Sequence, residues 1–324
     1  MEFSRDVLKI DPDKETERIG SFIAKTILVD MHKKGAVVGL SGGIDSAVSA
    51  ALCVRALGPE KVLGVILPEK DSSNLSEKYG LSLAERLRIR TARTDITPVL
   101  EDFGAYKNRD RVVDEIFPDF DPSTWRYKIV LPQDLLERDR LNVFSLVVQL
   151  PDGSEKKKRL STQDYLQIVA STNIKQRTRM VYLYYVAEKN NYAVVGTTNR
   201  TEFRQGFFVK YGDGGVDIEP LAHLYKSQIY MLAESLNIPE EIRERSPSPD
   251  TYTAEVSDTE FYFSVPFHIL DPFLWADENN IPHTRICEVL SLTREQYDRI
   301  KKNTDRKATA TWHYLETPPT VAQN

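Results

Sequence analysis

The residues best suited to chemistry stand together in one short segment, Gly39-Leu40-Ser41-Gly42-Gly43-Ile44-Asp45-Ser46. Adjacent glycines let main-chain N–H groups approach an anion closely, and the two serine hydroxyls add donors. A helix expected to follow at 45–57 points its positive end at the same place, so the segment predicts a phosphate cradle. It has neither the lysine of a Walker A loop nor the GxGxxG spacing. The competing interpretation is an ordinary glycine-containing turn between a strand and a helix.

The aspartate inside this segment is unusual beside phosphates, because two like charges repel. A carboxylate there is favourable only when a cation bridges it to the phosphate oxygens, and Mg²⁺ is the usual choice. Asp45 therefore predicts a magnesium-dependent site for a nucleotide.

The elements that must position this segment alternate between strands and helices. Apolar runs predict buried strands at 36–40, 61–67, 91–96 and 192–196, and the intervening patterns predict helices at 13–34, 45–57, 74–88 and 175–189. Strands and helices in this alternation form a parallel sheet covered on both faces. We therefore expect an α/β fold with a doubly wound parallel sheet.

Two regions interrupt the alternation. Residues 105–165 contain polar runs and an expected hairpin, with strands at 142–150 and 155–160 joined by a Pro-Asp-Gly turn. We interpret this region as an insertion within a single domain over 1–324. From about 246 a Pro-rich loop leads into short helices that reach about Asn303, which predicts a helical C-terminal extension over 246–324. The basic run at 156–159 is expected to be a solvated strand end.

Composition excludes several classes of protein. The 324 residues include 43 Lys or Arg and 48 Asp or Glu, a net charge of −5, which argues against a nucleic-acid binder held by general charge. No apolar stretch approaches the ~18 residues of a membrane span, and the N-terminus lacks the layout of a signal peptide. Two cysteines make neither a disulfide framework nor a CxxC pair. We expect a cytoplasmic chain with no membrane or nucleic-acid partner.

The segment 39–46 resembles the pyrophosphate-binding loop of the N-type ATP pyrophosphatases, which cleave ATP to AMP and pyrophosphate. Three later segments, 173–180, 196–202 and 207–217, closely resemble successive signatures of one branch of that superfamily, the NAD synthetases. Leu-Tyr-Lys-Ser-Gln at 224–228 continues the similarity. The resemblance extends over about 15–105 and 165–310, in order along the chain.

The resemblance implies roles for individual residues. The expected ATP contacts are residues 39–46 with Thr197, Lys226 and Ser248, and the expected Mg²⁺ ligands are Asp45 and Glu202. The expected contacts to the dinucleotide deamido-NAD are Arg177, Lys210, Asp217, Arg306 and Lys307. The expected catalytic residues are Asp213, which would hold ammonium and accept its proton, and Lys226, which would stabilise charge on the phosphates.

Three of these residues also have purely structural interpretations. Arg177 would suit a solvated helix face, Glu202 a plain surface acid, and Asp217 a cap on main-chain N–H groups. The chain also departs from the family near its C-terminus, where Asp305-Arg306-Lys307-Ala308 replaces the usual His-Lys-Arg. The carboxylate acceptor is therefore less firmly implied than the use of ATP.

The resemblance implies ATP-dependent amidation of deamido-NAD to NAD through an acyl-adenylate, with ammonia as the nitrogen donor and a homodimer as the assembly. Only about 35 residues precede the first strand, whereas glutamine-dependent members carry a long glutaminase domain there. A separate glutaminase partner stays open. The alternatives are a ligase of the same superfamily with another carboxylate acceptor and a non-catalytic nucleotide-binding homologue.

Overall fold

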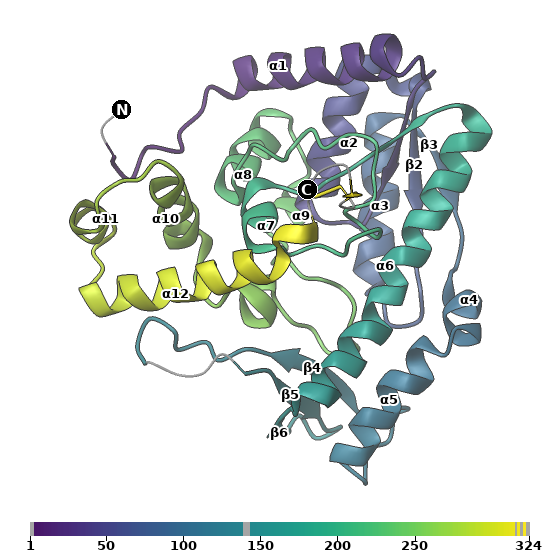
Figure 1. Cartoon of the computed structure of the whole chain (residues 1–324). Coiled ribbons are helices and arrows are strands. Elements are labelled where there is room, and N and C mark those ends of the chain that lie inside the picture. Colours follow the sequence, from purple (N-terminus) through teal and green to yellow (C-terminus); the bar gives the residue numbers. More distant parts are fainter. Residues whose placement is uncertain (1–2, 139–142, 315, 318–319, 322–324) are drawn as a thin grey trace.

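A four-stranded parallel sheet organises the molecule, for which a computed structural model describes residues 3–138, 143–314, 316–317 and 320–321 (Figure 1). Its strands are β1 (Ala36–Gly39), β2 (Val62–Ile66), β3 (Arg90–Arg93) and β7 (Ala193–Val195). The order is β3-β2-β1-β7, with every neighbouring pair parallel. The chain leaves β1 toward β3 on one side and later adds β7 on the other, which confirms the predicted doubly wound fold. The order in which strands are added therefore reverses between β1 and β7, although all four strands run parallel.

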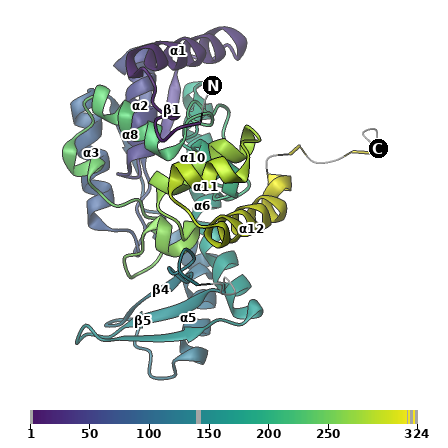
Figure 2. The ribbon, with the colours of Figure 1, turned by 90° about the vertical axis from the view of Figure 1, so that its left-hand side faces the viewer.

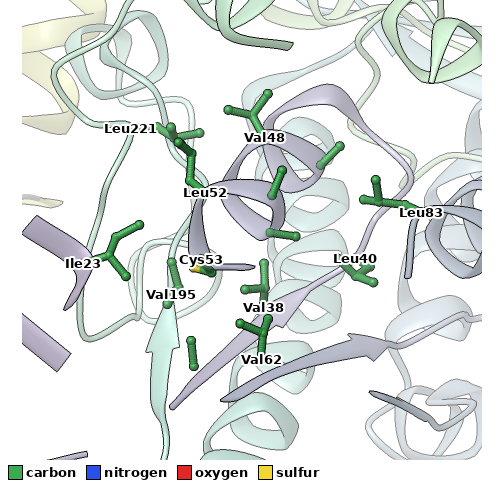
Figure 3. Close-up of a cluster of buried hydrophobic side chains, with 14 of the residues drawn as sticks. Ile23, Val38, Leu40, Val48, Leu52, Cys53, Val62, Leu83, Val195 and Leu221 are labelled. Carbon is green, nitrogen blue, oxygen red and sulfur yellow. The ribbon is translucent and has the colours of Figure 1, made fainter. Parts of the chain in front are cut away.

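Helices cover both faces of the sheet. One face carries α1 (Pro12–Ala24), α2 (Ile44–Leu57), α3 (Asn74–Leu87) and α8 (Lys226–Ser235), and the other carries α4 (Thr97–Asp102), α5 (Ala105–Ile116) and α6 (Thr162–Asn190). Successive strand residues point to opposite faces of the sheet, so that Val38 packs under α2 and Val37 packs under α6. Figure 3 shows Val38, Val62 and Val195 beneath Val48 and Leu52 of α2. Small residues on α2 let this helix lie close to the sheet.

Three predicted boundaries differ from the structure. The helix expected over 13–34 ends at Asp30, after a π-helical turn at Lys25–Asp30. The strand expected over 91–96 is Arg90–Arg93. The helix expected over 175–189 is the second half of the 29-residue α6.

The region predicted as an insertion, residues 105–165, contains α5, the start of α6 and an antiparallel sheet of β4 (Arg126–Val130), β5 (Ser145–Gln149) and β6 (Glu155–Arg159), which we name the inserted sheet. Strands β5 and β6 make the predicted hairpin, and Gly153 supplies the positive φ of +83° in its turn. The first residue of that predicted hairpin, Asn142, lies outside the described residues. Figure 2 shows this sheet at one end of the molecule, with β4 nearest the rest of the chain. The basic run 156–159 is exposed on β6, as expected.

The part beyond residue 246 is mostly helical, as predicted, with α10 (Phe267–Glu278), α11 (His283–Leu290) and α12 (Arg294–Thr311). The short helices α7 (Arg200–Gln205) and α9 (Glu240–Arg243) precede it. The last helix has 18 residues and ends beyond the predicted boundary near Asn303. Helices α10 to α12 share an apolar core with Phe3 and Leu8, so the start of the chain packs against its end. Among the helices of the described residues, none has both the length and the apolar character needed to cross a bilayer.

Candidate active site

The predicted phosphate loop lies between β1 and α2, where the order of strand addition reverses between β1 and β7. In doubly wound sheets this point forms a crevice at the carboxyl ends of the strands, where ligands bind. The Ser41 and Ser46 hydroxyls lie 3.1 Å apart, and the Ser46 hydroxyl donates to the Gly43 carbonyl at 2.9 Å. These contacts shape the turn and present the N-terminus of α2 to the crevice. The arrangement suits an anion such as a phosphate.

Gly42 occupies a backbone conformation that only glycine adopts without strain, with φ of +72°. A Cβ atom there would lie 2.5 Å from the main-chain oxygen of Ser76, at the start of α3. The phosphate loop and α3 therefore approach each other too closely for any side chain between them.

Gly42→Ala is accordingly expected to destabilise the fold and to weaken ATP binding. The positive φ alone costs about 1–2 kcal/mol, and relief of the clash must displace the Ser76 backbone as well. Gly153→Ala is the matched control, since it has a φ of +83° and nothing within 4 Å of the added Cβ. Urea unfolding and the KM for ATP measure both effects; equal losses of stability in the two variants would contradict the close approach.

The loop opens into a cavity of about 820 Å³, within the usual size range of small-molecule sites. Most of the predicted site residues line it: Gly39, Leu40, Ser41, Gly43, Ile44, Asp45, Ser46, Arg177, Thr197, Glu202, Lys210, Asp213, Lys226 and Ser248. These residues come from segments up to about 200 positions apart in the sequence. The fold therefore brings together the predicted contacts for ATP and part of those for the acceptor.

A cluster of charged side chains lies at the mouth of the phosphate loop. The Lys226 ammonium donates to Asp45 Oδ2 at 2.5 Å and lies 3.8 Å from Glu202 Oε1. The charge of Asp258 also favours the protonated form of Lys226, so three carboxylates act on one lysine. Burial raises the pKa of Glu202 well above its usual range, with the Asp45 charge adding to the effect. Burial opposes protonation of Lys226, but Asp45 and Glu202 nevertheless raise its pKa.

This donor set suits a hard divalent cation. Three acids share one lysine, and burial raises the pKa of Asp258 to about 6, so a divalent cation would stabilise the ionised carboxylates. Within residues 3–138 and 143–314, no three His, Cys, Asp or Glu side chains could hold a metal by themselves. Mg²⁺ commonly takes only one or two protein carboxylates and completes its shell with water and substrate phosphates. Asp45 and Glu202 fit that pattern.

Neighbouring elements hold the cluster in place. Asn199 caps α7 by accepting from the Glu202 N–H at 3.1 Å, and its side chain also donates to Asp45 Oδ1 at 2.9 Å. The fully buried Asp271 of α10 accepts from the Thr201 hydroxyl at 2.7 Å and from the Ser227 N–H at 2.8 Å. Helix α10 thereby joins the start of α7, which carries Glu202, to the start of α8, which carries Lys226.

The predicted ammonia contact Asp213 and two of the predicted acceptor contacts, Arg177 and Lys210, also line the cavity. Asp213 Oδ1 accepts from the Val209 N–H at 2.8 Å, and removal from bulk water raises the pKa of Asp213. The Arg177 guanidinium donates to the Lys210 carbonyl at 3.4 Å. The Lys210 ammonium itself donates to the His313 carbonyl at 2.6 Å. The Lys210 ammonium has three N–H donors, so it can contact a ligand anion while it keeps this bond to the C-terminal segment.

Three predicted acceptor contacts are absent from the cavity lining. Asp217 accepts from the Val194 N–H at 2.8 Å and from the Tyr184 hydroxyl at 3.1 Å, as its structural interpretation requires. Arg306 is exposed on α12. The Lys307 ammonium donates to the Tyr262 carbonyl at 2.6 Å, and burial lowers the pKa of Lys307 to about 7. Their roles in acceptor binding stay predictions.

Several cavity residues carry no recognisable signal in the sequence. Arg245, Asp250 and Asp258 line the cavity, yet they lie beside the Pro-rich loop at 246–249, in a region without periodicity. Asn199 lies inside the 196–202 segment, and its capping pattern Asn-Arg-Thr-Glu was visible in the sequence. Its contact with Asp45 depends on the fold.

The sequence pattern of the NAD synthase family matches residues 15–117 and 139–310. Proteins named NH(3)-dependent NAD(+) synthetase are 43% identical in Mesorhizobium japonicum, over 98% of both chains, and 45% identical in Rhizobium meliloti, over 99% of this chain and 95% of that one. A solved NMN synthetase from Francisella tularensis superposes with a TM-score of 0.66 at 25% identity, covering 96% of this chain and 99% of that one. The resemblance seen in the sequence is confirmed, and the chain belongs to the NAD synthase family of ligases.

Proposed function

We propose that the protein amidates deamido-NAD to NAD, using ATP and ammonia and releasing AMP and pyrophosphate. The observation that carries this proposal is the charge cluster of Asp45, Glu202 and Lys226 beside the N-terminus of α2, inside one cavity. The Mesorhizobium and Rhizobium relatives are named for ammonia-dependent synthesis of NAD, and they match over nearly the full chain.

The first step would activate the acceptor. A nicotinate carboxylate oxygen attacks the α-phosphorus of ATP, the bond from that phosphorus to the bridging oxygen breaks, and pyrophosphate leaves. The phosphate loop, Thr197 and Ser248 would hold ATP, and Lys226 would stabilise charge on the departing phosphates. Asp45 and Glu202 would hold Mg²⁺, which when bound neutralises phosphate charge.

The second step would form the amide. Ammonia attacks the acyl carbon, the bond from that carbon to the AMP oxygen breaks, and one proton is lost. Before this attack Asp213 would hold ammonium and accept one of its protons, which leaves ammonia as the nucleophile; the later proton goes to solvent. Arg177 and Lys210 would contact the anionic acceptor from the cavity wall, together with Asp217, Arg306 and Lys307 if the acceptor or an assembly extends to them.

The proposal includes a homodimer of single-domain chains in the cytoplasm. Free ammonia is the proposed donor, and a separate glutaminase would be an additional source. Nicotinate mononucleotide is a second candidate acceptor, because the Francisella protein is named an NMN synthetase.

The experiment supplies ATP, Mg²⁺ and ammonium with deamido-NAD, with nicotinate mononucleotide, or with a panel of other carboxylates, and measures AMP, pyrophosphate and the amide. AMP and pyrophosphate should appear together, fastest with deamido-NAD. Formation of ADP and phosphate would place the cleavage at the wrong phosphate and contradict the proposal. Faster turnover of another carboxylate would reassign the acceptor.

A further inference from the structure

The segment that carries Ser248 and Asp258 is residues 245–260, which we name the arch. It is irregular as far as residue 257 and ends in a π-helical turn at Thr259–Phe263. It begins just after α9, borders the cavity and returns to the body of the protein before α10. An irregular segment of this length has few internal hydrogen bonds, so its position depends on what it contacts.

The first half of the arch is attached to the nucleotide side of the cavity. The Arg245 guanidinium donates to the Ser76 hydroxyl at 2.8 Å, and Asp250 accepts from that hydroxyl at 2.6 Å and from the Ser73 N–H at 3.0 Å. The Lys175 ammonium of α6 donates to the Thr251 carbonyl at 2.9 Å. Ser248 therefore has anchors on both sides.

The second half of the arch is attached to the insertion. Strand β4 lies at the edge of the inserted sheet, and its free side faces residues 253–260. The Tyr127 N–H donates to Thr253 Oγ1 at 2.8 Å, and the Ala254 N–H donates to the Tyr127 carbonyl at 3.0 Å. The Leu131 N–H donates to the Glu260 carbonyl at 2.9 Å. The free edge of β4 is therefore hydrogen-bonded to the arch.

Side chains strengthen this attachment. The Gln133 amide donates to the Leu131 and Glu260 carbonyls, each at 3.0 Å, and so bridges the two segments. Tyr127 is only 1% exposed and meets the Tyr252 ring at 6.5 Å between centroids. The insertion itself rests on the main body, since the Tyr127 hydroxyl donates to Asp110 of α5 at 2.9 Å.

The inserted part of this attachment lies outside the general family pattern. That pattern matches up to residue 117 and resumes at 139, so β4 and residues 131–133 fall in the gap between the two matched stretches. A segment that the family pattern does not match thus contacts the arch, which contributes eight residues to the cavity lining.

We propose that residues 126–133 are a clamp that holds the arch in its nucleotide-binding position before ATP arrives, with Tyr127 and Gln133 as positioning residues. This inference rests on the proposed use of ATP at the cavity. A pre-ordered arch spares ATP binding the entropy cost of ordering the segment. If a weakened clamp leaves the arch in place only a tenth of the time, the apparent affinity for ATP falls about tenfold.

The test combines Gln133→Ala with Thr253→Val. The first removes the bridging amide, and the second keeps the side-chain shape but removes the oxygen that accepts from Tyr127. Gln149→Ala is the matched control, because Gln149 donates to Glu155 at 2.8 Å across β5 and β6, away from the arch. Hydrogen exchange of peptides covering 245–260 is measured without ATP, and steady-state kinetics give the KM for ATP and kcat.

We expect the arch to exchange slowly in the unaltered chain and the control, and at least tenfold faster in the double variant. The KM for ATP should rise about tenfold, while kcat at saturating ATP stays near its original value. Unchanged exchange in the double variant, or an arch that is protected in the unaltered chain only after ATP is added, would overturn the proposal. Faster exchange of the arch with an unchanged KM for ATP would also overturn the proposal.

The experiment distinguishes failure of the clamp proposal from unfolding of the variant and from failure of the proposed function. If the double variant also exchanges rapidly in β1 and α2, its fold is lost. The exchange of residues 245–260 and the KM for ATP are then measured in Gln133→Ala alone, with the same expected results. If the unaltered chain does not turn over ATP, the proposed function fails, while the exchange comparison still decides whether residues 126–133 hold the arch.

Discussion

Asp45→Asn is expected to lower turnover by at least about 10²-fold, the usual scale for removing one preorganised electrostatic contact. The substitution keeps the shape of the side chain but removes the charge that faces Lys226 and the proposed Mg²⁺. Glu202→Gln should have a comparable effect for the same reason. AMP release under saturating ATP, Mg²⁺ and deamido-NAD measures both.

The double variant distinguishes a shared site from two independent ones. Because Asp45 and Glu202 are proposed to act through one ion, loss of either should remove most of their joint effect, and the double variant should be far less than additive. Two large and fully additive losses would contradict a shared ion. Asp30→Asn is the matched control, since it makes the same change in a surface pair with Lys25 at 2.7 Å.

Asp213→Asn is expected to separate the two halves of the reaction. Adenylate formation, followed as exchange of labelled pyrophosphate into ATP, should largely persist, because Asp213 makes no described contact with the phosphate loop or Lys226. Amide formation from ammonium should fall by roughly 10²–10⁴-fold, the typical contribution of a positioned acid or base. Loss of pyrophosphate exchange in this variant would contradict the assignment.

The pH dependence gives a second readout for Asp213. Burial raises its pKa, so its ionised, ammonium-binding form is lost at a higher pH than for an ordinary aspartate as the solution is acidified. The acid limb of the amidation rate should therefore lie above the ordinary aspartate range, and Asp213→Asn should remove that contribution. The isolated chain should also use ammonium well and glutamine poorly; efficient use of glutamine would contradict the proposed donor.

Local sequence was sufficient for the sheet and for the phosphate loop. Alternating strands and helices can bury both faces of a parallel sheet in few ways, and the Gly-Gly turn after the first strand has to lie at the carboxyl end of that strand. The resemblance then identified Glu202, Lys226 and Asp213 as members of the same site, and the structure places all three on one cavity with Asp45.

Only the tertiary structure decided what surrounds these residues. Asp258 joins the charge cluster from an irregular segment whose position depends on contacts with β4 and α6, and no periodicity marks such contacts in advance. Asp217 accepts from the Val194 N–H because its segment runs beside β7 and bonds to it, and its contact with the acceptor stays a prediction. Local patterns determine secondary structure over a few turns of chain. The position of an irregular segment depends instead on hydrogen bonds to residues that are distant in the sequence. Thr253 and Glu260, for example, accept from Tyr127 and Leu131, more than a hundred positions away.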